Sequence, residues 1–170
     1  NHFKDDACFA DIVRLAQEKG YTEPDPRDEL KGTDFLRKML ILARDAGYVI
    51  EAKDVEIENI LPQVCLDAQS ISDFYKELDA SEAHFTELKN KAKASNKVIR
   101  YIGKLENGQA SISLQMVDEH HPFYTLSGSD NIISFTTERY KDRPLVVKGP
   151  GAGAEVTAAG VFSDLVNVGA

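Results

Sequence analysis

The sequence is poor in cysteine and in long apolar segments. Its only cysteines are Cys8 and Cys65, which do not form a CxxC pair. Each lies within an apolar pattern, so buried free thiols in a reducing cytosol are favoured over a disulfide, and we predict a cytoplasmic protein. The longest apolar stretches, such as residues 39–43, are far shorter than the roughly 20 residues of a transmembrane helix. We therefore expect no membrane partner.

Positive charge is also scarce, because 20 Lys and Arg residues face 28 Asp and Glu residues and the formal net charge is −8. No basic stripe offsets the repulsion from phosphates, so we expect no nucleic-acid partner. What is present is an ordinary globular composition over 170 residues, which favours one domain spanning residues 1–170. The chain opens on Asn1 rather than Met, which indicates a fragment of a longer protein.

Apolar residues at helical spacing predict a first helix over 6–19, capped by Asp5 or Asp6 and ended by Gly20. A second helix begins at Thr33 or Asp34 and ends at Gly47. Its apolar stripe is wide, so we expect this helix to be well buried. Two more helices are predicted in 70–96, with a break at 79–81.

Strand signals follow a different period. Partial alternation predicts a half-exposed strand within 49–60, and a hairpin pairs 98–105 with 109–117 across the turn-forming Asn107-Gly108. Further strands are expected at 132–138 and 144–149, continuing an antiparallel meander, before a glycine-rich turn that opens a final helix. The order of elements predicts an α+β fold, with helices packed on one face of a mostly antiparallel sheet.

One stretch gathers acidic side chains beside a lysine. Pro24 and Pro26 favour extended conformations for Glu23 and Asp25, so the loop displays carboxylates at low entropic cost. On the next helix Asp34 and Lys38 stand at i and i+4, on one face. Such a pair is usually a solvated ion pair. The apolar helix and the upstream carboxylates instead predict a half-buried lysine facing several acids, which is a candidate acid/base or ligand-orienting group.

Other motifs favour structural roles. The glycines of VVKGPGAGAEV imitate a dinucleotide-binding loop, but the chain ends before a second parallel strand. A tight strand-to-helix turn and an anion-facing helix N-terminus both remain open for this segment. His120 and His121 are adjacent, so on a strand they would point to opposite faces, and a polar loop is favoured over a metal site. We expect no metal.

Two segments resemble the homoserine dehydrogenase family. The first is GYTEPDPRDELKGTDFLRKMLILAR at 20–44, which is similar to the family run G-Y-x-E-P-D-P-x-x-D/E-x-x-G-x-D-x-x-x-K. The second is GPGAGAEVTAAGVFSDL at 149–165, which is similar to the family's closing segment. The sequence between them resembles the form fused to an aspartokinase in bifunctional aspartokinase/homoserine dehydrogenase.

This resemblance implies reversible hydride transfer between L-homoserine and L-aspartate 4-semialdehyde, with NAD(P), in threonine and methionine biosynthesis. It implies that Lys38 is the acid/base, that Glu23 and Asp34 hold the substrate, and that Gly20 and Gly153 approach the cofactor. Partial burial would favour a neutral lysine and nearby carboxylates a charged one, and the sequence leaves both open.

The family places a nucleotide-binding domain before the segment that matches this chain, together with a monovalent-cation site. The resemblance therefore implies that NAD(P) is bound mainly by a part absent from these residues, to which the glycine-rich helix 149–170 returns. We predict negligible dehydrogenase activity for the 170 residues alone. It also implies a homodimer formed through the sheet at 98–117 and 132–148.

A non-catalytic regulatory or oligomerisation module of an amino-acid biosynthetic enzyme is the alternative function, because helices over an antiparallel sheet also occur in effector-binding domains. The displayed Glu23 and the helix face with Asp34 and Lys38 favour the catalytic interpretation.

Overall fold

The computed structural model describes residues 7–20, 22, 24–128, 130–151 and 153–169. The chain forms two compact units, a larger one that extends to Asp118 and a smaller one that begins at Glu119. Helices and strands are mixed in both units, and the paired strands are mainly antiparallel. The predicted α+β class is confirmed.

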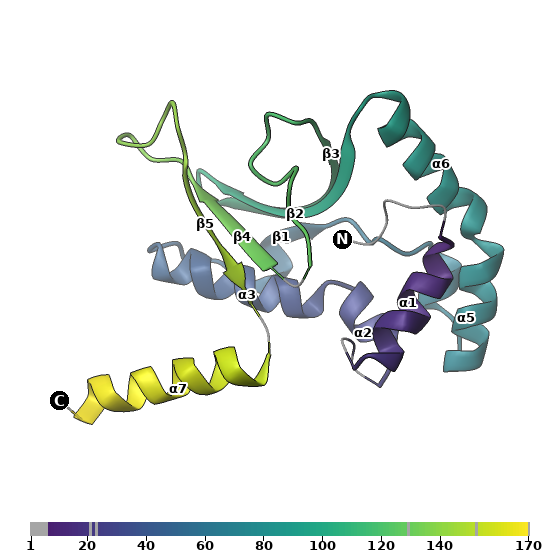
Figure 1. The fold of residues 1–170 in the computed structure, drawn as a ribbon, viewed down its shortest axis with the longest axis horizontal. Coiled ribbons are helices and arrows are strands. Elements are labelled where there is room, and N and C mark those ends of the chain that lie inside the picture. The colour runs from purple at the N-terminus through teal and green to yellow at the C-terminus, as the bar shows by residue number, and fades with distance from the viewer. Residues whose placement is uncertain (1–6, 21, 23, 129, 152, 170) are drawn as a thin grey trace. The chain divides into compact units, whose positions relative to one another are not determined.

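A group of helices builds the first core of the larger unit. These helices are α1 (Phe9–Glu18), α4 (Gln63–Leu66), α5 (Ile71–Ala80) and α6 (Glu82–Ala94), and Figure 1 shows α1, α5 and α6 lying together at one end of this unit. Their apolar faces meet in a cluster of buried residues: Ala10, Val13, Leu61, Cys65, Phe74, Leu78 and Phe85. Ser70 caps α5 by accepting a hydrogen bond from the Asp73 amide.

A three-stranded sheet forms the other half of the larger unit. Its strands are β1 (Val55–Ile57), β2 (Val98–Glu106) and β3 (Gln109–Val117), in the order β1-β3-β2. Strands β2 and β3 form the predicted hairpin, and the positive φ angles of Asn107 (51°) and Gly108 (78°) fit its turn. Strand β1 pairs with β3 in parallel, which the expectation of a meander did not include.

Helix α3 (Thr33–Asp45) packs on this sheet. Met39 and Ala43 are buried against Ala110 and Ile112, and the short 3-10 helix η1 (Ala52–Asp54) leads into β1. The rest of the helix is more open than expected, because the Ile41 side chain is 60% exposed. The prediction of a well-buried helix is therefore correct only for the stripe that faces the sheet.

The smaller unit contains β4 (Asp130–Phe135), β5 (Leu145–Pro150) and α7 (Ala154–Gly169). The two strands pair antiparallel in a sheet of their own, so the expected continuous meander is divided between two sheets. No described residue of α7 is buried. Large apolar side chains of this helix are open to solvent, including Phe162 and Leu165, both at 67% exposure.

Most predicted helix and strand bounds agree with the structure within a few residues, although the predicted start of the first helix lies outside the described residues. The strand predicted within 49–60 is an exception, because only Val55–Ile57 form a strand and the 3-10 helix η1 precedes them. The short helices α4 and α2 (Pro26–Leu30) were not predicted, nor was η1. Within the described residues, no helix combines the length and the apolarity that spanning a membrane requires.

Candidate functional site

The proline-rich loop ends in a tightly held turn. Pro26 occupies the first position of α2, where its missing N–H leaves no bond unmade. The Asp25 carboxylate accepts a hydrogen bond from the Arg27 amide at 3.0 Å, and the Arg27 Nε atom donates to the same carboxylate at 2.9 Å. The Arg27 and Asp25 side chains are only 15% and 29% exposed. Hydrogen bonding from the Arg27 guanidinium lowers the pKa of Asp25.

Two long-range hydrogen bonds hold the same loop. The Arg27 guanidinium donates to the carbonyl oxygen of Ala68, which follows α4. The Gln17 side-chain amide of α1 donates to the Pro24 carbonyl oxygen at 3.0 Å. Neither hydrogen bond was predicted from the sequence. Both acceptors are backbone carbonyl oxygens, and Ala68 is also distant in sequence from Arg27.

The predicted Asp34–Lys38 pair is present on α3. The Lys38 Nζ atom lies 2.6 Å from Asp34 Oδ2, and the two side chains are 53% and 49% exposed. Lys38 is thus more open than predicted, because the buried stripe of α3 runs through Met39 and Ala43 instead. Its ammonium and the carboxylate of Asp34 are accessible to a small polar ligand.

The other acidic side chains do not all converge on Lys38, which corrects the expectation of one lysine facing several carboxylates. Asp25 forms its ion pair with Arg27, and the Asp28 carboxylate lies 4.0 Å from the Lys31 Nζ atom. Each of these carboxylates has a nearer cation in its own turn of the chain. Glu23, the predicted substrate-holding carboxylate, lies outside the described residues, as does the side chain of Glu29.

The two predicted cofactor-approaching glycines have positive φ angles. Gly20 (φ 69°) ends α1, and its amide donates to the Gln17 carbonyl oxygen at 3.0 Å. Gly153 (φ 129°) precedes α7, and its carbonyl oxygen accepts from the Thr157 amide at 3.0 Å. A Cβ atom at either glycine would meet no atom within 4 Å, so both backbones leave open space beside them. Gly20 belongs to the larger unit and Gly153 to the smaller one.

The start of α3 is set by a close contact between Gly32 and Tyr101. Gly32 has a φ angle of 73°, and a Cβ atom there would lie 2.8 Å from the Tyr101 hydroxyl oxygen. That hydroxyl donates to the Glu58 carbonyl oxygen at 3.1 Å, and the ring packs against Phe35. Burial, together with the Glu58 charge, raises the pKa of Tyr101 and keeps the hydroxyl a donor. This contact positions the helix turn that carries Asp34.

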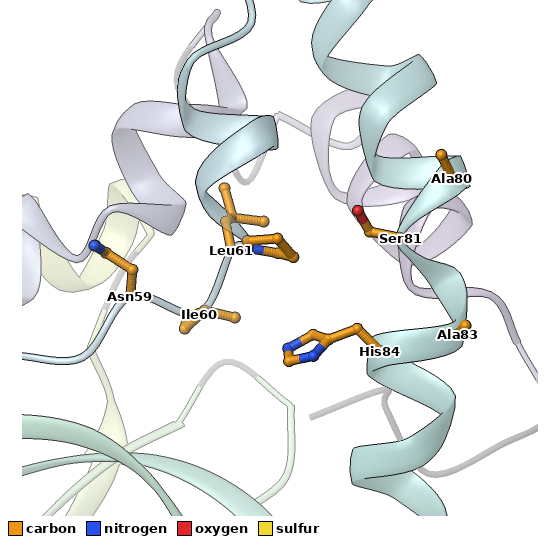
Figure 2. Close-up of a pocket in the computed structure, with 8 residues that line it drawn as sticks. Asn59, Ile60, Leu61, Ala80, Ser81, Ala83 and His84 are labelled. Atoms are coloured by element: carbon orange, nitrogen blue, oxygen red, sulfur yellow. The ribbon is translucent and has the colours of Figure 1, made fainter.

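An open cavity lies elsewhere in the larger unit. Its volume is about 440 Å³, and it separates the segment before α4 from the junction of α5 and α6. Figure 2 shows the His84 ring projecting from α6 toward Ile60 across this space. The residues that line the cavity include neither Asp34 nor Lys38, so we do not assign the predicted chemistry to it.

Both cysteines are free, as predicted. Burial raises the pKa of the Cys8 and Cys65 thiols, which keeps them protonated and poorly reactive. The His121 Nδ1 atom accepts a hydrogen bond from the Phe123 amide, a local turn contact. Over the part of the chain that the structure describes, no cluster of three or more His, Cys, Asp or Glu side chains could hold a metal ion.

Comparisons with known proteins connect this arrangement to one family. The family model described as homoserine dehydrogenase matches residues 1–166. A bifunctional aspartokinase/homoserine dehydrogenase of Zea mays is 44% identical over 170 residues, which cover 99% of this chain and 18% of that protein. A homoserine dehydrogenase of Schizosaccharomyces pombe is 43% identical over 171 residues, covering 99% of this chain and 46% of that protein. The chain thus spans less than half of either relative.

Solved structures have the same fold. A Candida auris protein of unknown function is 41% identical with a TM-score of 0.89, over 97% of this chain and 47% of that one. A structure titled as a putative homoserine dehydrogenase from Archaeoglobus fulgidus is 26% identical with a TM-score of 0.72, over 98% of this chain and 44% of that one. From the family match and the identities of these relatives, the chain belongs to the homoserine dehydrogenase family.

Proposed function

We propose that the chain is the substrate-binding and catalytic part of a homoserine dehydrogenase, which interconverts L-homoserine and L-aspartate 4-semialdehyde with NAD(P). The observation that carries the proposal is the accessible Asp34–Lys38 pair on α3, within the segment that resembles the family motif. Family membership supplies the reaction class, and the pair supplies a proton-transfer group beside a carboxylate.

Lys38 is the acid/base in this proposal. In the oxidation direction the hydroxyl proton of homoserine passes to the amine of Lys38, and in the reverse direction the ammonium returns it to the forming alkoxide. When bound, NAD(P) would supply the acceptor for the hydride that leaves the carbinol carbon. Its approach fits Gly20 and Gly153, because both have positive φ angles and open space where a side chain would stand.

Substrate binding is assigned to carboxylates. Homoserine carries an ammonium group, and Glu23 and Asp34 are the acidic residues that we propose hold its amino and hydroxyl ends. Asp25 is less available to the substrate than Asp34, because its side chain is 29% exposed against 49% for Asp34 and its carboxylate is hydrogen-bonded by Arg27. The loop therefore divides its acidic residues between an internal structural role and a binding role.

The remaining parts of the proposal concern the whole enzyme. We propose that residues 1–170 form the catalytic and dimerisation part, that two copies associate through the sheet strands, and that α7 packs on the nucleotide-binding part. Exposed apolar side chains support both surfaces: Val147 of β5, at 54% exposure, and Phe162 and Leu165 of α7. The protonated free thiols Cys8 and Cys65 suit a reducing compartment such as the cytosol.

The test replaces Lys38 by Ala in the complete enzyme, expressed from the whole gene. We expect kcat for homoserine oxidation to fall by about 10²-fold or more, the typical loss of a general acid/base. The fold should survive, because an exposed helical ion pair contributes only a few tenths of a kcal/mol. Lys76→Ala is the matched control, since Lys76 forms a similar exposed pair with Asp73 on α5.

Normal turnover by Lys38→Ala, in a protein whose circular dichroism matches that of the wild type, would contradict the proposed chemistry. If such a variant instead lost an effector response, the regulatory alternative would take its place.

A further inference from the structure

The first turns of α3 carry two ridges of side chains. Phe35 and Met39 stand at i and i+4 and face the sheet, where Met39 belongs to the buried cluster and Phe35 packs against it. Asp34 and Lys38 each precede one of these residues, so they are turned by about 100° around the same helix axis. Because one helical backbone carries both ridges, the contact between α3 and the sheet sets where the Lys38 side chain begins.

Two residues of β2 contact the ridge that faces the sheet. Tyr101 and Gly103 stand at i and i+2 of the strand, which places them on one face of the sheet. The centroid of the Tyr101 ring lies 5.6 Å from that of Phe35, and the Tyr101 hydroxyl donates to the Glu58 carbonyl oxygen at 3.1 Å. This hydrogen bond limits the freedom of the phenol ring, so Phe35 meets a fixed partner.

Gly103 allows α3 to approach the strand closely. A Cβ atom there would lie 3.2 Å from the Phe35 Cζ atom and 3.2 Å from the Met39 Sδ atom, which is closer than ordinary van der Waals contact. The φ angle of Gly103 is not positive, so the backbone conformation does not require a glycine. The lack of a side chain therefore serves the packing of helix on strand.

We propose that Gly103 and Tyr101 are positioning residues for the Lys38 amine. This inference rests on the proposed function, which makes Lys38 the acid/base. Tyr101 holds the Phe35 ring, and the lack of a side chain at Gly103 sets how closely the first turns of α3 lie on the sheet. Both residues act through the helix and touch neither substrate nor cofactor.

The experiment measures steady-state kinetics of the complete enzyme with Gly103→Ala. The added methyl group must displace Phe35 and Met39 by a few tenths of an ångström, and the displaced helix moves the Lys38 amine relative to the substrate. We expect kcat for homoserine oxidation to fall roughly tenfold, because catalysis depends on sub-ångström placement of the reacting groups. The KM for NAD(P) should stay within about twofold of wild type, since the change lies on the sheet side of α3.

Tyr101→Phe is the second variant, because it keeps the ring and removes only the hydrogen bond to Glu58. The ring then gains some freedom, so kcat should fall by a smaller factor of roughly threefold.

Two further variants separate positioning from general damage. When Gly103→Ala is added to Lys38→Ala, kcat should fall by no more than about twofold further, because the positioned amine is already lost. Gly47→Ala is the matched control, since it also replaces a glycine beside α3 but its Cβ atom would meet no atom within 4 Å. It should leave kcat and both KM values unchanged.

The inference is overturned if Gly103→Ala folds, as judged by circular dichroism, and leaves kcat within twofold of wild type. It is also overturned if Gly103→Ala lowers kcat by the same factor in the wild-type and Lys38→Ala backgrounds. Should Gly103→Ala not fold, Tyr101→Phe decides, and a kcat equal to that of wild type overturns the inference. Failure of the proposed function has a different signature, because Lys38→Ala alone would then leave kcat unchanged.

Discussion

Replacing Gly32 by Ala tests whether the start of α3 is set by the Tyr101 contact. At φ 73° an alanine is in the left-handed region, which carries a strain of about 1–2 kcal/mol for an L-residue. The new Cβ atom would also stand 2.8 Å from the Tyr101 hydroxyl oxygen, so the phenol must move. Movement would break the 3.1 Å hydrogen bond to the Glu58 carbonyl, a loss of about 1 kcal/mol.

Displacing the ring would also disturb its packing on Phe35, where the centroids are 5.6 Å apart, at a cost of about 0.5–1 kcal/mol. The sum is a loss of about 3 kcal/mol in the free energy of unfolding. Urea denaturation followed by far-ultraviolet circular dichroism measures it.

Gly47→Ala is the control for backbone strain alone, because Gly47 also has a positive φ (88°) but its Cβ would meet no atom within 4 Å. We expect Gly47→Ala to lower the free energy of unfolding by about 1 kcal/mol. In a Tyr101→Phe background the hydroxyl oxygen nearest to the new Cβ atom is absent. The loss in the free energy of unfolding caused by Gly32→Ala should then fall toward the loss caused by Gly47→Ala. Equal losses at positions 32 and 47 in the wild-type background would refute the steric reasoning.

Two other predictions concern acid stability and the extent of the active unit. Because Arg27 depresses the folded-state pKa of Asp25, the pair stabilises the fold above the unfolded-state pKa of about 4, and this contribution disappears as pH falls through the folded-state value. Asp25→Asn, which can still cap α2, should therefore be about 1 kcal/mol less stable than wild type near pH 7 and equal to it in strong acid; a difference independent of pH would contradict this. The 170 residues alone should show negligible homoserine oxidation with NAD(P), and appreciable turnover in a standard absorbance assay would contradict the expectation that cofactor binding lies mainly outside them.

Local signals predicted most of the fold. The Asn107-Gly108 turn and the flanking period of two were sufficient for the β2–β3 hairpin, because turn chemistry and alternation act over neighbouring residues. Helices α2 and α4 have only five and four residues, which is too short for a 3.6-residue period to appear. The parallel pairing of β1 with β3 joins segments more than 50 positions apart, and nothing in either segment specifies that partner.

The candidate site was likewise predictable only where its contacts join residues close in sequence. Asp34 and Lys38 could be paired because i and i+4 positions are adjacent on any helix. The number of nearby carboxylates did not show which cation each one binds, and Asp25 and Asp28 pair within their own turn. The hydrogen bond from Tyr101 to Glu58 spans 43 positions, so only the folded chain reveals it. The bifunctional form is likewise not distinguished, because relatives of both forms have nearly the same identity.

The Asp34–Lys38 distance has a consequence for the proposed reaction. At 2.6 Å the Lys38 ammonium already occupies the carboxylate that is proposed to hold substrate. The proposed assignment brings the substrate hydroxyl to Asp34, so this hydroxyl must approach oxygen atoms that Lys38 already contacts. Because both side chains are about half exposed, Lys38 can shift away from Asp34 without any opening of the core. The shifted ammonium would donate its proton to the forming alkoxide in the reduction direction, whereas oxidation requires that Lys38 first release a proton to solvent so that its neutral amine can accept the hydroxyl proton. The pair in the free protein is then the resting arrangement of the proposed acid/base group.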